Sequence, residues 1–195
     1  MLATPSRLDP QRRLSGSVEA LARKTRSTQG RPLGRSDRRW LVFTSKKGGA
    51  DVGYGRKGKG TTIMLMVDGE GTPLSAFTTA ANVSEVHAVE TLVDERATAQ
   101  KPERLMYDKA ADADWLREAL ELRGIALVCP HRANRNKPPQ QDGRALRRYK
   151  RRYKVERSIS WLHNFRRLIT RWEYYPELFE GFIHLGCLYT VLKGF

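Results

Sequence analysis

The alternation of short apolar runs with helical segments is the feature that most constrains the fold of this chain. Five apolar runs have the length and flanking turn residues of β-strands, and they cover residues 40–44, 62–67, 73–79, 104–107 and 125–129. Four segments repeat apolar residues with the helical period, at 82–93, 115–122, 145–172 and 178–192. The turn Asp68-Gly69-Glu70-Gly71 joins the second and third strands into a hairpin. This order predicts an α/β layered domain with a mixed sheet.

Charge points to the chemical class of the partner. The chain of 195 residues carries 36 Lys and Arg against 21 Asp and Glu, a formal net charge of +15. The excess is uneven, because residues 1–60 carry +11, residues 61–126 carry −6 and residues 127–195 carry +10. Basic groups near a polyanion release its condensed counterions, so the two basic flanks predict a nucleic-acid partner. The acidic middle is typical of carboxylates gathered for chemistry, with solvated surface charge as the alternative.

The remaining composition excludes several classes of protein. Residues 1–36 are rich in Arg, Ser and Gly and poor in apolar groups, so we expect a disordered basic tail before a domain over 37–195. No stretch approaches the roughly 20 apolar residues that span a bilayer, which predicts a cytoplasmic protein without a membrane partner. Two cysteines are too few for a disulfide framework and indicate a reducing compartment.

Two carboxylates stand at positions that suit chemistry. Asp108 ends a buried strand, at the edge where open α/β sheets bind ligands. The predicted helix 145–172 has a polar wedge of about 80°, which contains Tyr149, Arg152, Glu156, Ser160 and His163. Carboxylates from separate elements hold the two divalent cations that phosphodiester cleavage uses. The structural alternative is that Asp108 caps the next helix and Glu156 pairs with Arg152.

Four ordered motifs resemble the DDE transposases of bacterial insertion sequences. They read KKGG…RKGKGT, LMVDGEGTPL, RLMYDKAADADWLR and RRYKVERSISWLHNFRRL, and they span residues 46–61, 65–74, 104–117 and 151–168. The last motif is similar to the group whose acidic helix carries a Tyr-x-x-Arg-x-x-x-Glu signature, formed here by Tyr149, Arg152 and Glu156. The resemblance extends from about residue 44 to residue 195.

This resemblance implies a ribonuclease H-like fold and metal-dependent cleavage and strand transfer of DNA at the ends of a mobile element. Asp108 and Glu156 would be the second and third catalytic acids. They would ligate Mg²⁺ or Mn²⁺ in a two-metal site. The implied partners are transposon ends, target DNA and further copies of the chain, as a homo-oligomer or dimer in a synaptic complex. The implied location is the bacterial cytoplasm, in association with the nucleoid.

Basic residues around the motifs are the expected DNA contacts. The glycine-rich loop 45–62 contributes Lys46, Lys47, Arg56, Lys57 and Lys59. The acidic helix contributes Tyr149, Arg152, Arg147, Arg148, Arg151 and His163. By resemblance, Tyr149 and Arg152 support the phosphate of the cleaved strand. The group often has a lysine seven residues after the acid, where this chain has His163.

The first catalytic acid departs from the pattern of the group. There, an Asp-Gly-Ser/Thr stretch precedes the Lys-Lys-Gly-Gly motif, and aligning residues 46–49 with that motif places Arg39 where the aspartate belongs. Asp37 lies two residues earlier and would project from the same strand face, so a shift in register is the alternative. The helical DNA-binding portion of the group has no counterpart before residue 36. We therefore expect an N-terminally truncated or degenerate copy with impaired catalysis.

Two other functions are alternatives to an active transposase. A catalytically inactive remnant that binds DNA would inhibit the intact enzyme by occupying its sites or by dimerising with it. An unrelated basic RNA-binding domain is disfavoured, because the sequence has no aromatic strand motif of the RNP type.

Smaller candidate sites also have structural interpretations. Cys129 and His131 lack a second Cys/His pair at ligand spacing, so a buried cysteine is favoured over a zinc site. The acid in the Asp68-Gly69 turn is assigned to the turn itself. We expect His184 and Cys187 in the core of the last helix. Three aromatic residues either stack on bases or anchor that helix, and they are Trp172, Tyr174 and Tyr175.

Overall fold

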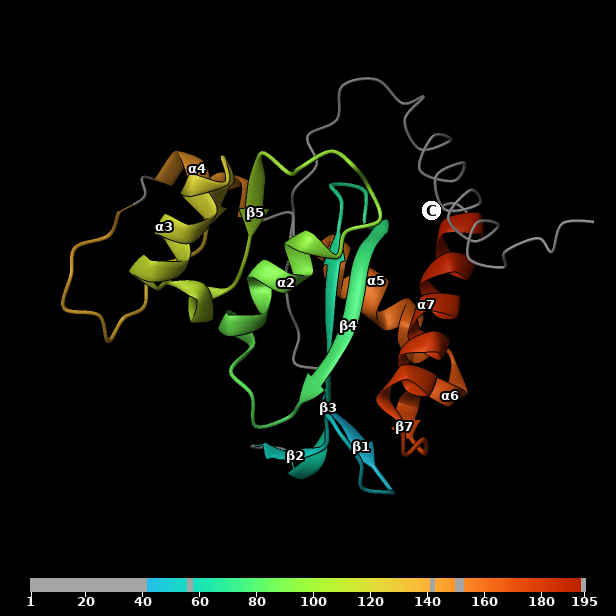
Figure 1. Cartoon of the computed structure of the whole chain (residues 1–195). Coiled ribbons are helices and arrows are strands. Elements are labelled where there is room, and N and C mark those ends of the chain that lie inside the picture. Colours follow the sequence, from blue (N-terminus) through green and yellow to red (C-terminus); the bar gives the residue numbers. More distant parts are fainter. Residues whose placement is uncertain (1–41, 56–57, 141–142, 150–152, 194–195) are drawn as a thin grey trace, which may run out of the picture.

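The computed structural model describes residues 42–55, 58–140, 143–149 and 153–193 (Figure 1). Its strands are β1 (Val42–Ser45), β2 (Gly53–Gly55), β3 (Gly58–Val67), β4 (Pro73–Ala80), β5 (Arg104–Met106), β6 (Ala126–Val128) and β7 (Thr170–Arg171). Its helices are η1 (Glu85–Ala88), α2 (Val89–Asp94), η2 (Lys109–Ala111), α3 (Asp114–Leu122), α4 (Gly143–Tyr149), α5 (Tyr153–His163), α6 (Arg166–Ile169) and α7 (Pro176–Lys193), where η marks a 3-10 helix.

Strand β3 organises the larger sheet. β4 and β1 both run antiparallel to it, with Phe77 opposite Met64 and Phe43 opposite Thr61. β2 pairs antiparallel with the start of β3, and β7 runs parallel to β1. β5 and β6 form a separate parallel pair. The predicted hairpin and the predicted mixed sheet are therefore confirmed.

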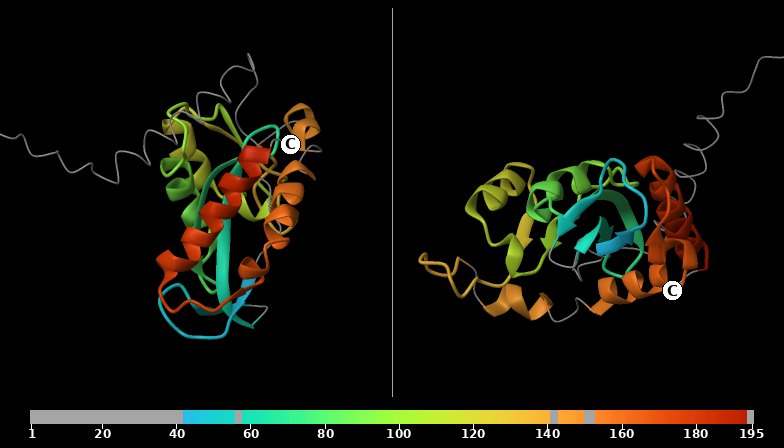
Figure 2. Two further views of the ribbon diagram at one scale, coloured as in Figure 1. Left: turned by 90° about the vertical axis from the view of Figure 1, so that its right-hand side faces the viewer. Right: turned by 90° about the horizontal axis from the view of Figure 1, so that it is seen from below.

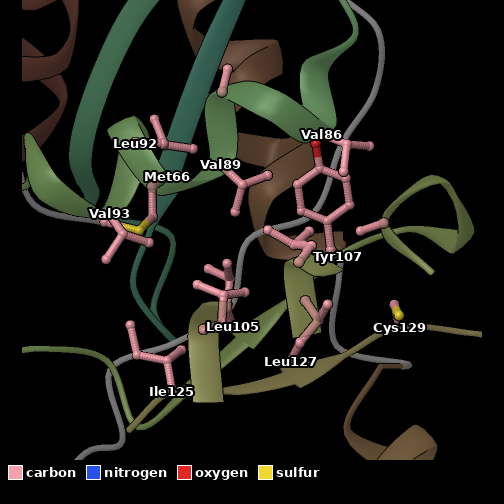
Figure 3. Packing of buried hydrophobic residues seen from close by; sticks show 14 of the residues in the cluster. Met66, Val86, Val89, Leu92, Val93, Leu105, Tyr107, Ile125, Leu127 and Cys129 are labelled. Carbon is pink, nitrogen blue, oxygen red and sulfur yellow. The ribbon is translucent and has the colours of Figure 1, made fainter. Parts of the chain in front are cut away.

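Alternate residues of β3 supply two apolar cores, because successive side chains of a strand point to opposite faces. Met64 and Met66 pack with residues of α2, α3, β5 and β6, in the cluster shown in Figure 3. Ile63, Leu65 and Val67 pack with residues of α5 and α7. The right-hand view of Figure 2 shows α2 and α3 on one side of the strands and α5 on the other. The sheet is thus covered on both faces, as an α/β layered domain requires.

Polar contacts hold helix α5 on the turn between β3 and β4. Lys154 Nζ donates to the carbonyl of Gly69 at 2.6 Å, and Ser158 Oγ donates to the carbonyl of Gly71 at 2.5 Å. Gly71 has a φ of +92°, and a Cβ there would lie 3.0 Å from Ser158 Oγ. Glycine is the residue that fits this conformation and this close approach. The start of α5 is consequently fixed against the end of β3.

The single helix predicted over 145–172 is wrong. Helix α5 ends at His163, and Phe165 has extended dihedral angles (φ −82°, ψ 107°) ahead of the short helix α6. The next two residues pair with β1 as β7. Residues 150–152, where α4 would join α5, lie outside the described ranges.

The buried guanidinium of Arg171 explains why the helix stops. Its Nη1 donates to Thr61 Oγ1 at 2.9 Å, and its Nη2 donates to the carbonyls of Ala50 and Tyr174 at 2.9 and 3.0 Å. These acceptors come from β3, from the loop after β1 and from the segment before α7. An extended segment at β7 holds Arg171 among them, which local helical periodicity cannot anticipate.

Two further expectations need correction. Of the apolar residues that define the predicted helical segment 115–122, α3 buries Leu116 and Leu120, but Trp115 is 43% exposed and Leu122 is 90% exposed. The loop predicted over 45–62 contains β2 and the start of β3. The sequence analysis missed this hairpin, because its many glycines carry no apolar side chains that would indicate a strand. Within the described ranges, no helix is long and apolar enough to cross a membrane.

Candidate active site at the carboxyl end of β5

Asp108 lies directly after β5, where the sequence predicted it. The preceding residue, Tyr107, donates its backbone N–H to the carbonyl of Val128, which extends the pairing with β6 to the edge of the sheet. Asp108 Oδ1 accepts a hydrogen bond from the Ala110 backbone N–H at 2.7 Å and caps η2. Asp108 therefore caps this short 3-10 helix rather than the predicted helix 115–122, whose N-cap in the structure is Ala113. This cap fixes the carboxyl group at the sheet edge.

A second carboxylate, Glu85, was missed in the sequence analysis. It begins η1, and only 4% of its surface is exposed. Burial and, to a smaller extent, the negative charge of Asp108 together raise the pKa of Glu85 from 4.5 to about 7. The two acids therefore interact, although the whole of α2 separates them along the chain. A buried acid with a raised pKa beside another acid is typical of a functional site.

The apolar pattern of the predicted helix 82–93 contained a signal for Glu85. Val89 and Leu92 follow it by four and seven residues and are fully buried. Positions with this spacing share one face of a helix. A carboxylate on the apolar face of 82–93 is therefore the pattern that would have identified the residue.

A polar network holds the loop after β6 against η2. Asp112 accepts hydrogen bonds from the Arg132 backbone N–H (3.0 Å) and from the side chains of Arg135 (2.5 Å) and Arg117 (3.3 Å). His131 Nδ1 lies 3.2 Å from the same carboxylate. Burial alone would raise the pKa of Asp112, but these donors lower it overall. These basic groups thereby hold the loop after β6 against the segment that follows Asp108.

An aromatic pair connects η1 and α3. His87 of η1 stacks on Trp115 of α3, with ring centroids 5.1 Å apart and an interplanar angle of 12°. Both side chains are exposed. The pair thus joins η1, which begins with Glu85, to α3.

Glu156 lies near the start of α5, and its side chain is half-buried. Its carbonyl accepts a hydrogen bond from Ser160 Oγ at 2.8 Å. Arg152, the ion-pair partner considered in the sequence analysis, lies outside the described ranges. The convergence of Glu156 with Asp108 on a cation stays a prediction. In the part of the chain that the structure describes, no three His, Cys, Asp or Glu side chains gather as a metal site.

The predicted DNA-contact residues fall into two regions. Lys46, Lys47 and Lys59 are exposed near the β1, β2 and β3 ends at the bottom of Figure 1, whereas Arg147 is exposed on α4 at the upper left. Several predicted residues lie outside the described ranges, namely Asp37, Arg39, Arg56, Lys57, Arg151 and Arg152. The side chains of Arg148 and Tyr149 are also outside the description.

His163, at the position of the expected lysine, ends α5. Its ring centroid lies 5.5 Å from that of Phe43. Partial burial there lowers the pKa of His163. The neutral form is therefore favoured over the cation that a phosphate contact would use.

Some predictions for the smaller candidate sites are confirmed, and the one for His184 is wrong. Cys129 is buried, as predicted, and Asp68 Oδ1 accepts hydrogen bonds from two backbone N–H groups of its turn. Cys187 packs against the core, and burial raises its pKa to about 12. His184 is exposed rather than in the core, and its ring lies 2.7 Å from the Ala76 carbonyl of β4. The three aromatic side chains that precede α7 are all exposed, and they are Trp172, Tyr174 and Tyr175.

The mixed sheet and the helices on both of its faces define a ribonuclease H-like α/β domain. A family described as "Transposase DDE domain" matches residues 22–191, and the chain belongs to this family. The putative transposase for insertion sequence element IS402 from Burkholderia cepacia is 32% identical over 198 residues, which cover 96% of this chain and 90% of that protein. The resemblance noted from the motifs is therefore confirmed.

A solved transposase structure supports the fold. A piggyBac transposase synaptic complex with hairpin DNA matches with a TM-score of 0.53 at 11% identity, over 80% of this chain. The chain spans 45% of that protein's length, and the likeness concerns the fold alone. The catalytic domain of Mos1 mariner transposase matches with a TM-score of 0.36 at 14% identity, over 95% of this chain and 98% of that one.

Proposed function

We propose that this chain is a transposase domain that binds the DNA ends of an insertion sequence and uses Asp108 and Glu156 in metal-dependent cleavage and strand transfer. The single observation that carries this proposal is the placement of Asp108 after β5, beside a buried carboxylate whose pKa it raises. Family membership supports the class of reaction. The name of the relative supports an insertion sequence as the element.

The acidic site suits a divalent cation. Mg²⁺ and Mn²⁺ prefer carboxylate oxygens completed by water and phosphate. Asp108 and Glu85 provide such oxygens, and a cation beside them would offset both causes of the raised pKa of Glu85, which are its burial and the charge of Asp108. We assign Asp108 and Glu156 as ligands of Mg²⁺ or Mn²⁺ in a two-metal site. The bound cation would supply Lewis-acid activation of the phosphodiester.

The DNA-binding surface is assigned to the basic residues of the two flanks. Lys46, Lys47, Lys59 and Arg147 are exposed and point their charge into solvent. We assign residues 37–195 to the catalytic domain and residues 1–36 to a basic tail that adds phosphate contacts. Two or more copies of the chain would assemble on a pair of DNA ends, in the bacterial cytoplasm at the nucleoid.

Catalysis is proposed to be impaired. Arg39 stands at the aligned position of the first acid, and a guanidinium there would repel a cation held by Asp108 and Glu156. Loss of electrostatic stabilisation of this kind costs on the order of several kcal/mol of barrier. The same alignment favours the second candidate function, a DNA-binding remnant that inhibits the intact enzyme.

A plasmid-nicking assay separates these functions. Purified full-length chain is incubated with supercoiled plasmid and Mn²⁺, and nicked circles are quantified. We expect slow nicking that Asp108→Asn and Glu156→Gln abolish and that Arg39→Asp accelerates. Glu121→Gln, an exposed acid on α3, is the matched control and should nick like the wild type. Binding without nicking in both the wild type and Arg39→Asp would reject the active enzyme in favour of the remnant.

A further inference from the structure

The hairpin formed by β2 and the start of β3 alternates glycine with two larger side chains. In pairing register it reads Gly53, Tyr54 and Gly55 opposite Gly60, Lys59 and Gly58. Among these paired residues, Tyr54 and Lys59 therefore carry the only side chains. Directly opposite residues of an antiparallel pair lie on the same face, so the phenol ring and the ammonium group are neighbours. Figure 1 shows this hairpin at the lower end of the described molecule.

The opposite face of β2 has no room for side chains. A Cβ on Gly53 would overlap the side chain of Asn82, and a Cβ on Gly55 would lie 2.6 Å from the carbonyl oxygen of Ala81. Glycine thus allows the β2 backbone to lie directly on the segment after β4. Successive side chains of a strand point to opposite faces, so Tyr54 points away from that segment. Its exposed fraction is 76%, the largest among the Phe, Tyr and Trp side chains that the structure describes.

Buried contacts fix both ends of the hairpin. The fully buried Arg171 donates from Nη2 to the carbonyl of Ala50, before β2, and from Nη1 to Thr61 Oγ1, directly after Gly60. Thr61 Oγ1 in turn donates to the carbonyl of Asp51 at 2.6 Å. A ring on a hairpin held in this way is positioned before a ligand arrives, so binding orders little of the chain.

We propose that Tyr54 and Lys59 bind one nucleotide of unpaired DNA, with its base stacked on the tyrosine ring and its phosphate at the lysine ammonium group. Every base has a π-face that stacks on an aromatic side chain, and a basic group beside the ring attracts the phosphate. In a duplex the neighbouring bases cover both faces of a base, so the base on Tyr54 is an unpaired one. Lys46 and Lys47 are exposed just after β1, which pairs with β3 at Gly60, and they would hold neighbouring phosphates.

This inference rests on the proposed DNA binding and deepens it by naming the group that the hairpin recognises. Fluorescence anisotropy compares the affinity of the full chain for oligo-dT with that for an abasic oligonucleotide of equal length and charge. Duplex DNA, titrated in parallel, reports on the proposed function alone. The wild type should bind oligo-dT roughly tenfold more tightly than the abasic oligonucleotide.

Variants assign this preference to the ring. Tyr54→Ala should bind both oligonucleotides equally, whereas Tyr54→Phe, which keeps the ring, should retain the preference. Lys59→Ala should weaken binding of both oligonucleotides by the same factor, because both contain the phosphate. Tyr189→Ala changes an exposed tyrosine of α7 and is the matched control, which should behave like the wild type.

Each other outcome overturns the inference in a distinct way. Equal affinity of the wild type for the two oligonucleotides, with duplex binding intact, would overturn it and leave the proposed function standing. A Tyr54→Ala variant that keeps the preference, or a Tyr54→Phe variant that loses it, would show that the ring of Tyr54 is not the stacking group. Tighter binding of oligo-rU than of oligo-dT would assign the site to RNA instead. A wild type that binds none of the three DNAs would reject the proposed function as well.

Discussion

The charge of Asp108 acts on Glu85, and together with burial it raises the pKa of Glu85 to about 7. One acid follows β5, and the other begins the helical segment after β4. The candidate site is centred on these two acids, which come from separate segments of the chain. Their interaction also makes the stability of the domain depend on pH.

We predict that Glu85→Gln stabilises the protein above neutral pH. The usual pKa of glutamic acid is 4.5, so the folded state retains the Glu85 proton over a pH range in which the unfolded chain has lost it. The stabilising contribution is full below pH 4.5 and is lost as the pH rises through about 7. Removing the charge should therefore stabilise the variant by up to about 3 kcal/mol in alkaline solution and have little effect in acid. Urea denaturation across pH measures this difference.

The matched control for this prediction is Glu121→Gln, which changes an exposed carboxyl group. It should unfold like the wild type at every pH. Equal unfolding curves for Glu85→Gln and the wild type at alkaline pH would show that Glu85 ionises normally and that the two acids do not interact.

Arg171 should be essential for stability. Its guanidinium donates to Thr61 Oγ1 and to three carbonyl groups, all within a fully buried site. Arg171→Met leaves these acceptors without their donor, and we expect a loss on the order of 3–5 kcal/mol in the free energy of unfolding. Arg166→Met, at an exposed position of α6, should cost less than about 1 kcal/mol. A small effect at Arg171 would contradict the account of why the chain leaves the helix before β7.

The loop after β6 should depend on Asp112. This buried carboxylate binds the Arg132 backbone and the side chains of Arg117 and Arg135, so Asp112→Asn should cost about 3 kcal/mol. Limited trypsin digestion reports on the loop, because Arg132 and Arg135 are cleavage sites. We expect faster cleavage there in Asp112→Asn but not in Asp94→Asn, whose carboxylate is 61% exposed. Unchanged cleavage would mean that the network does not hold the loop.

DNA binding should show the salt dependence of phosphate contacts. Each neutralised phosphate contributes a slope of about −0.9 to the logarithm of affinity against the logarithm of salt concentration. Lys59→Ala, on β3, should reduce the slope by about one contact. Lys101→Ala, an exposed lysine before β5, is the control and should leave the slope unchanged. Fluorescence anisotropy with duplex DNA over a salt series measures both variants, and equal slopes would exclude Lys59 from the interface.

Local signals in the sequence predicted much of the fold. The β3–β4 hairpin follows from apolar runs around the Asp68 turn, and Asp68 indeed accepts hydrogen bonds from the Glu70 and Thr72 backbone. α3 ends at Leu122, the last residue of the predicted segment 115–122, and Gly124 after it has a φ of +73°. These features depend on residues a few positions apart.

Contacts between distant segments could not be predicted in this way. The break after His163 depends on acceptors for Arg171 in β3 and in the loop after β1. The raised pKa of Glu85 depends on its burial between the assembled layers and, to a smaller extent, on the charge of Asp108. Both effects arise only when the layers are assembled, so periodicity within one segment does not reveal them.

Binding of Mn²⁺ to the wild type, Asp108→Asn, Glu156→Gln and the double variant tests the central claim most directly. Isothermal titration calorimetry gives the four affinities without DNA or turnover. If both carboxylates hold one cation, each single variant should lose most of the affinity, and the double variant should bind no more weakly than either. Wild-type affinity in either single variant would contradict the assignment of Asp108 and Glu156 to one metal site.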